Sequence, residues 1–96
     1  MKTFNDLQFE TLSDPFMSGK MCRIMFDNGW GASVVSHTYS YGGKNGLYEL
    51  AVLDSDGELH YDNVVAEGDV RGYLEEEDVT ELLKQIQEYE RFNQEV

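Results

Sequence analysis

The chain has 96 residues, of which 41% are hydrophobic and 12% aromatic, and its formal net charge is −12 at pH 7. So short a chain has apolar surface for one core only, so we expect a single domain over residues 1–96 with frayed ends at about 1–3 and 93–96. A surface this negative repels nucleic acid and anionic membranes, which argues against direct binding to either of them.

The first half of the sequence alternates apolar and polar residues in the manner of β-strands. The clearest hairpin is at Asn28-Gly29, which lies between two β-rich runs and favours a type I′ turn, because these residues tolerate positive φ at both central positions. A second turn, Ser55-Asp56-Gly57, follows a buried strand. The expected strands lie at about 6–12, 21–27, 30–38, 47–54 and 58–62.

From residue 63 the hydrophobic period changes to that of a helix. A connector over about 67–72 precedes an apolar stripe with three- and four-residue steps, which predicts a helix of about 15–17 residues. The stripe consists of Val79, Leu82, Leu83, Ile86, Tyr89 and Phe92. We therefore expect an α+β fold: an antiparallel meander of four to five strands with one C-terminal helix packed on one face.

Acidic residues are concentrated in the middle of the chain. Residues 49–81 contain twelve acids against one base, Arg71, whereas acids and bases cancel over residues 1–48. Carboxylates in the first turn of a helix, such as those of the run Glu75–Asp78, face unpaired backbone N–H groups, and each contributes about 0.3–1 kcal/mol. That effect explains about half of the run, and a solvated helix face remains the alternative for the rest.

We expect most acids of residues 49–81, including this run, to form a surface for a partner, together with two tyrosines of a Gly-rich loop over residues 38–46. The predicted contact residues are Tyr39, Tyr41, Asp54, Asp56, Glu58, Asp62, Glu67, Asp69, Glu75, Glu76, Glu77, Asp78 and Glu81.

Metal sites have weak support in the sequence. The stretch Asp54–Glu58 resembles the start of a calcium loop, but the twelfth position, where a bidentate acid is needed, is Val65. A hairpin turn with Gly57 in the left-handed conformation explains the same residues without a metal. The possible zinc ligands, Cys22, His37 and His60, lack the usual spacing. We therefore predict no metal and no cofactor.

Catalytic motifs are also lacking. Ser33, Ser36 and His37 lie close together in the sequence, but no nucleophile elbow accompanies them. The stretch Gly42–Gly46 follows no parallel strand and opens no helix, so it is not a phosphate-binding loop. Trp30, directly after the hairpin turn, is either a packing residue, which we favour, or an exposed anchor. We predict that the protein is not an enzyme.

Four stretches of the sequence, at residues 26–35, 48–53, 57–62 and 69–83, resemble small acidic proteins of tailed bacteriophages and prophages. The resemblance covers about residues 3–90, and it implies a phage or prophage origin without known catalytic residues. One departure is at the expected helix start, where Glu75 stands in place of a hydroxyl cap. That puts a conventional N-cap in doubt but not the helix.

Phage origin and uneven acidity together predict an interaction protein. We expect a counter-defence protein, such as an anti-CRISPR, or a host-takeover inhibitor that binds a basic host protein surface in the host cytoplasm, with carboxylates standing in for DNA phosphates. No secretion signal is expected, and the single cysteine, Cys22, cannot form an internal disulfide. One alternative is a homo-oligomeric adaptor that uses a sheet edge or Trp30, Tyr39 and Tyr41. The other is a binder of a nucleotide signal, which so negative a surface disfavours.

Overall fold

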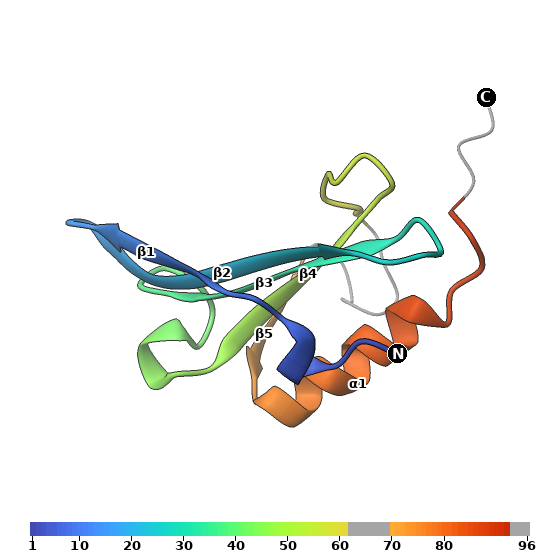
Figure 1. The fold of residues 1–96 in the computed structure, drawn as a ribbon. Helices are drawn as coiled ribbons and strands as arrows, with labels where there is room; N and C mark the ends of the chain where they lie inside the picture. Colours follow the sequence, from blue (N-terminus) through green and yellow to red (C-terminus); the bar gives the residue numbers. More distant parts are fainter. Residues whose placement is uncertain (62–69, 93–96) are drawn as a thin grey trace.

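A computed structural model describes residues 1–61 and 70–92 of the chain. One five-stranded antiparallel sheet, with strand order β1-β2-β3-β4-β5, carries a single helix on one face (Figure 1). Strand order follows sequence order, so the sheet is a meander, and the predicted α+β fold is confirmed. The elements are η1 Phe4–Asp6, β1 Glu10–Asp14, β2 Met17–Met25, β3 Gly31–His37, η2 Gly43–Asn45, β4 Tyr48–Leu53, β5 Arg71–Leu74 and α1 Glu76–Gln87.

The core lies between the sheet and α1. Cys22, Val34 and Leu50 are cross-strand partners whose side chains point to the same face, and all three are buried in the core cluster. The predicted apolar stripe supplies the other side, through the buried α1 residues Val79, Leu82, Leu83 and Ile86. Because fully burying such a side chain contributes about 1.5–3 kcal/mol, this layer accounts for the position of the helix.

The opening strand begins later than the sequence predicts. Residues Phe4–Asp6 form the short helix η1, and β1 pairs with β2 only from Glu10 onward. The Asp6 carboxylate accepts a hydrogen bond from the Thr3 backbone N–H at 2.8 Å, and the Phe4 N–H donates to Thr80 Oγ1 on α1 at 3.0 Å. The first bond closes the short helix and the second holds it against α1, so its apolar residues cover the core instead of extending the sheet.

The hairpin between β2 and β3 is confirmed, but the expected type I′ turn is wrong. Only Gly29 has a positive φ, +87°, whereas Asn28 does not. The Gly29 N–H donates to Phe26 O at 3.0 Å, and the Phe26 N–H donates to Trp30 O at 2.7 Å. This is a three-residue loop that ends in a left-handed glycine, a geometry that needs positive φ at one position only.

Two predictions around the fifth strand are wrong. Residues 58–62 were expected to form a strand, but within the described part, up to residue 61, only an isolated bridge joins Leu59 to Leu53. The strand that does pair with β4 is β5, which begins within the expected connector and runs on to Leu74. Gly72 permits this, because a Cβ at that position would overlap the Tyr41 side chain of the neighbouring loop.

The helix is shorter than predicted, with 12 residues instead of about 15–17. Tyr89 and Phe92 continue the apolar spacing but pack from beyond the helix end onto the Trp30 ring, with centroid distances of 5.1 and 4.8 Å. At the other end the helix follows Glu75, whose N–H donates to the Asp78 carboxylate at 2.9 Å. In the described part of the chain, no helix has the length and apolar character needed to cross a membrane.

Candidate functional site

The described acids of the predicted contact surface form two groups at opposite ends of β4. One group, Asp54, Asp56 and Glu58, follows the end of the strand. The other is at the start of α1, directly after Leu74, which pairs with Tyr48 at the beginning of β4. The length of an extended strand of this size, about 20 Å, separates the two ends. Asp62, Glu67 and Asp69 lie outside the described residues.

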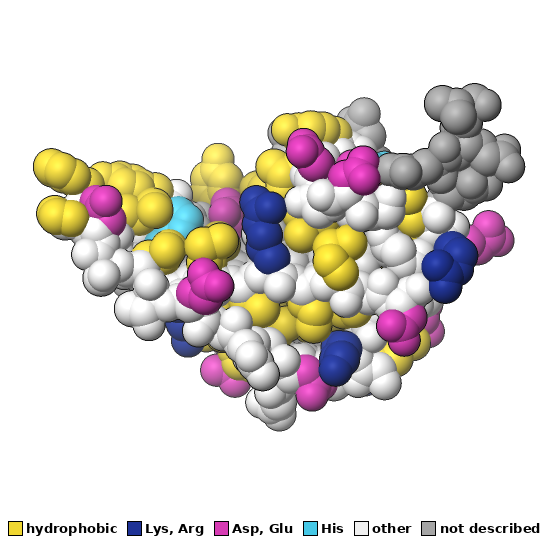
Figure 2. Space-filling model, turned by 45° about the horizontal axis from the view of Figure 1, so that its top comes forward, with side chains coloured by type: hydrophobic (Ala, Val, Ile, Leu, Met, Phe, Trp, Pro, Cys, Tyr) yellow, Lys and Arg dark blue, Asp and Glu magenta, His cyan; other side chains and the backbone are white. Residues whose placement is uncertain are grey.

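On the face shown in Figure 2, acidic side chains are dispersed among hydrophobic and basic ones, and they form no continuous negative area there. The charge of the chain is therefore not gathered on this face. The two groups of predicted contact acids have different local surroundings.

The carboxylate of Asp54 helps to build the turn after β4. Its Oδ1 accepts hydrogen bonds from the Asp56 and Glu58 backbone N–H groups, at 2.9 and 3.0 Å. Gly57 has a φ of +79°, so the left-handed glycine predicted for this turn is confirmed. Among the residues that the structure describes, no three His, Cys, Asp or Glu side chains are grouped as metal ligands.

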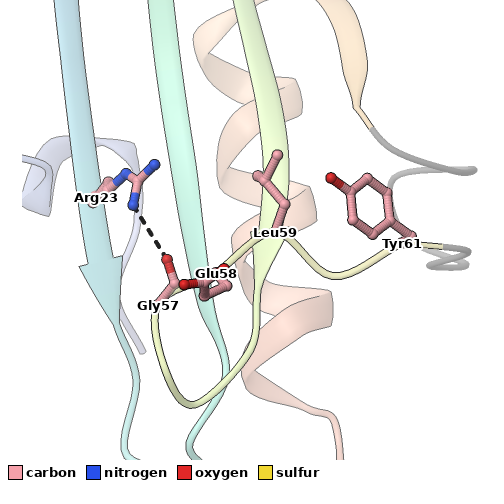
Figure 3. Close-up of a pocket in the computed structure, with 5 residues that line it drawn as sticks. All are labelled: Arg23, Gly57, Glu58, Leu59 and Tyr61. Carbon is pink, nitrogen blue, oxygen red and sulfur yellow. Dashed lines mark hydrogen bonds between the residues drawn. The ribbon is translucent and has the colours of Figure 1, made fainter.

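A basic side chain lies against the same turn. An open hollow of about 290 Å³ is lined by Arg23 from β2 and by residues of the segment that follows β4 (Figure 3). Arg23 Nη1 donates to Gly57 O at 3.2 Å, so a guanidinium is held beside the acidic turn. The opposite charge reduces the attraction of this turn for a cationic partner.

The acids at the start of α1 are arranged differently. Glu75, Glu76, Glu77, Asp78 and Glu81 are all exposed, and the first four occupy the N-cap and the first turn of the helix. The positive end of the helix dipole favours negative charge at these positions, so like charges can be held close together on a rigid element. Asp78 and Glu81 also line a hollow of about 100 Å³ between β5 and α1 together with Arg71, so this group too has a basic side chain beside it.

Exposed tyrosines adjoin this acidic helix start. Tyr41 of the Gly-rich loop is 58% exposed, and Tyr73 of β5 is 63% exposed. The Tyr73 N–H donates to Tyr41 O at 3.1 Å, and the two ring centroids are 6.5 Å apart. Because Tyr73 is two residues before Glu75, the structure brings the predicted Tyr41 and the helix acids to one region. Tyr39, 70% exposed, belongs to the same loop.

Tyr73 is not among the contact residues predicted from the sequence. Its φ of +56° is the only positive value for a described residue other than glycine. Holding an L-residue in this left-handed conformation costs roughly 1–2 kcal/mol, so the surrounding contacts must enforce it. The available signal in the sequence is an aromatic residue two positions before a run of carboxylates.

Trp30 is a packing residue, as favoured from the sequence. Its ring packs edge-on against His60, with a centroid distance of 4.8 Å, and against two aromatic rings that follow α1. Its Nε1–H donates to Glu90 O at 3.0 Å. Trp30 therefore joins the β2–β3 hairpin to the end of the helix and is not an exposed anchor.

The other candidate reactive side chains have structural partners. His37 Nδ1 accepts a hydrogen bond from the Tyr39 N–H at 3.1 Å, and the Ser40 hydroxyl donates to His37 O at 3.0 Å. The Cys22 thiol is buried, and desolvation raises its pKa. These contacts stabilise the loop after β3 and the core.

Comparisons with protein families, curated proteins and solved structures found no match to this chain. Surface geometry and charge are thus the observations that bear on function.

Proposed function

We propose that the protein is a non-enzymatic interaction protein that binds a basic surface of a partner protein through the start of α1. The observation that supports this most directly is the row of exposed carboxylates beside exposed tyrosines. We call this set the acid–tyrosine surface; it consists of Tyr39, Tyr41, Tyr73, Glu75, Glu76, Glu77, Asp78 and Glu81.

The chemistry of this surface suits arginine and lysine. Carboxylates fixed on a helix start attract cations without being ordered on binding, and the net charge of −12 adds a longer-range attraction. Tyrosine rings supply rigid contact area at a low entropic cost, and their faces attract guanidinium groups. A partner with clustered arginines would meet both kinds of group on one surface.

The partner class follows from the resemblance to phage proteins. We propose a host protein whose basic groove normally holds nucleic acid, such as a defence complex in the host cytoplasm. The carboxylates would then occupy phosphate positions, which makes the protein an inhibitor of the counter-defence or host-takeover kind. Asp54, Asp56 and Glu58, and the predicted Asp62, Glu67 and Asp69, are secondary contacts in this proposal.

A matched pair of triple variants tests the proposal. The first variant carries Glu76→Lys, Glu77→Lys and Glu81→Lys; the control carries Asp14→Lys, Glu88→Lys and Glu90→Lys, three exposed positions with the same total change in charge. Each is used with the wild type to capture partners from a nuclease-treated bacterial lysate at about 50 and about 500 mM salt. The captured protein is then purified and titrated against all three.

We expect the wild type and the control to bind at low salt and to release the partner at high salt, while the first variant fails to bind. A short DNA duplex should compete, because it would need the same groove on the partner. Equal binding by the two variants, or binding that salt does not weaken, would refute the proposal.

A homo-oligomeric adaptor is the second candidate, and the exposure of Tyr39 and Tyr41 favours it. Large exposed aromatic side chains are enriched in protein interfaces. Sedimentation of the wild type and of a Tyr39→Ser, Tyr41→Ser double variant separates the two candidates. A stable dimer that the double variant loses supports the adaptor, and a monomer supports binding to a different protein.

A further inference from the structure

Strand β2 extends past the end of its neighbour β1, so part of one edge of β2 has no paired strand among the described residues. The pairing of β1 with β2 ends at Glu10 and Met21, whereas β2 runs on to Met25. Figure 1 shows the segment before β1 turning away from β2 and running to α1, while β2 continues towards its hairpin turn. In the described chain, residues Cys22–Met25 therefore have β3 on one side and no strand on the other.

The hydrogen-bond pattern shows which backbone groups face this free edge. The Phe26 N–H donates to Trp30 O, so Phe26 bonds towards β3. In an antiparallel ladder, successive residues direct both backbone groups alternately to one neighbour and the other. Ile24 therefore bonds to β3, and Arg23 and Met25 present their N–H and C=O groups at the free edge.

Two adjoining hollows follow this edge. One, of about 160 Å³, is lined by Gln8, Glu10, Met21, Cys22 and Arg23, and the other, of about 280 Å³, by Asp6, Gln8, Cys22, Arg23 and Ile24. We call the two together the β2 edge groove. It combines unpaired backbone groups with apolar side chains and the carboxylates of Asp6 and Glu10, which are the parts needed to hold an extended chain.

We propose that an extended, basic segment of a partner protein adds to the sheet in the β2 edge groove, as an extra strand that pairs with Arg23 and Met25. A side chain opposite Ile24 would enter the larger hollow, so an apolar residue fits there. Lysine or arginine elsewhere on the segment would be attracted by Glu10 and Asp6, which line the groove.

The negative charge of the groove and of the chain favours a basic segment over a second copy of the chain as the occupant. Two copies would each bring a net charge of −12 to an edge that already carries two carboxylates. The Arg23 guanidinium lines both hollows and offsets one of these carboxylates, so the preference for a basic segment comes from the other carboxylate and from the net charge of the chain. The site does not involve the acid–tyrosine surface, so either proposal can fail while the other stands.

Amide exchange with defined peptides tests the proposal. The probe is a peptide of alternating lysine and valine, about eight residues long, and two control peptides carry glutamate for lysine or N-methyl groups on alternate amides. On binding of the probe, exchange of the Arg23 and Met25 amides should slow at least about tenfold, while that of the Ile24 amide, already bonded to β3, changes little. Both control peptides should bind at least about tenfold more weakly.

A substitution at Met25 gives an independent check. Proline is tolerated on a strand where the N–H faces outward, so Met25→Pro should keep the fold but remove an edge donor. It should bind the probe about five- to tenfold more weakly than Met25→Ala, with the fluorescence of Trp30 reporting that both are folded. Equal binding by the two variants, or a bound probe that leaves the Arg23 and Met25 amides unprotected, overturns the proposal. A dimer that protects those amides without any peptide also overturns it, since a second copy would then be the occupant.

Discussion

Asn28 is one of the side chains that join the β2–β3 hairpin to the end of α1, and it makes three of the hydrogen bonds there. Its Nδ2 group donates to Ile86 O at 2.9 Å and to Tyr89 O at 3.2 Å, and its Oδ1 accepts from the Trp30 N–H at 3.1 Å. Replacing Asn28 with Ala removes all three bonds while leaving the apolar core intact. The variant therefore measures how much this connection contributes to the stability of the fold.

The expected loss can be worked out from the contacts. Three bonds at about 0.5–1.5 kcal/mol each would give about 1.5–4.5 kcal/mol, but Asn28 is only half-buried and water can replace part of them. We expect Asn28→Ala to lower the free energy of unfolding by about 2 kcal/mol. For a chain of this length that corresponds to a fall in Tm of about 8–16 °C.

Asn28→Asp removes the two hydrogen bonds that the side chain donates and keeps the one that it accepts. It keeps the acceptor for the Trp30 N–H but turns a carboxylate towards the Ile86 and Tyr89 carbonyls and the negative end of the helix dipole. These surroundings raise the folded-state pKa of the new carboxyl above its unfolded value of about 3.9. Its contribution is favourable below the unfolded pKa and is lost as pH rises through the folded pKa. At pH 7 this variant should thus be less stable than Asn28→Ala, and the difference should shrink towards about pH 4.

Urea unfolding followed by Trp30 fluorescence measures both effects, with the two variants compared at each pH so that the titration of the other acids cancels. The reasoning is refuted if Asn28→Ala stays within about 0.5 kcal/mol of the wild type. It is also refuted if Asn28→Asp is as stable as the wild type at pH 7.

Three further predictions use the same unfolding measurement. Leu83→Ala should cost about 2–5 kcal/mol because Leu83 is fully buried, whereas Leu59→Ala, at a position 38% exposed, should cost much less; equal costs would contradict the assignment of the core. Tyr73→Gly should be more stable than Tyr73→Ala by about 1 kcal/mol, because glycine adopts positive φ without strain, and the reverse order would mean that the backbone is not left-handed there. Asp6→Asn should lower stability at pH 7, because the hydrogen bond from the Thr3 backbone lowers the Asp6 pKa in the folded state. The stability that the Asp6 carboxylate contributes is present above the usual pKa of 3.8 and is lost as pH falls through the lower folded value. A difference from the wild type that persists in acid would refute this.

The helix and the β2–β3 hairpin could be predicted because local pattern and tertiary packing agree there. Val79, Leu83 and Ile86 are spaced for one helix face, and all three are buried against the sheet. The end of α1 could not be predicted, since Phe92 continues that spacing although it packs on Trp30 from beyond the helix. Spacing alone does not distinguish a residue on the helix from one that returns to the same core after it.

The fifth strand could not be predicted because its pairing depends on a distant loop. In the sequence Arg71–Leu74, only Leu74 is buried, and a glycine and a left-handed tyrosine interrupt the strand pattern. The pairing with β4 is irregular, with a register shift between Tyr48 and Leu50. The Tyr73 N–H reaches Tyr41 O, about 30 residues earlier in the chain, and no local pattern carries that information.

The distance between the two acidic groups limits what a count of charges in the sequence says about binding. The sequence shows twelve acids in one stretch, but an antiparallel sheet sends consecutive segments to opposite ends, so Asp54–Glu58 and Glu75–Glu81 lie at opposite ends of β4. Arg23 lies against the first group, while the second adjoins Tyr73 and shares a hollow with Arg71. At physiological salt, electrostatic attraction is screened over roughly 8–10 Å. A partner bound at α1 would therefore be attracted mainly by the acids at the helix start and much less by the acids after β4. Lysine substitutions at Asp56 and Glu58 should then weaken such a complex less than the same change at Glu76 and Glu77. Equal effects would mean that the partner spans both ends of the strand.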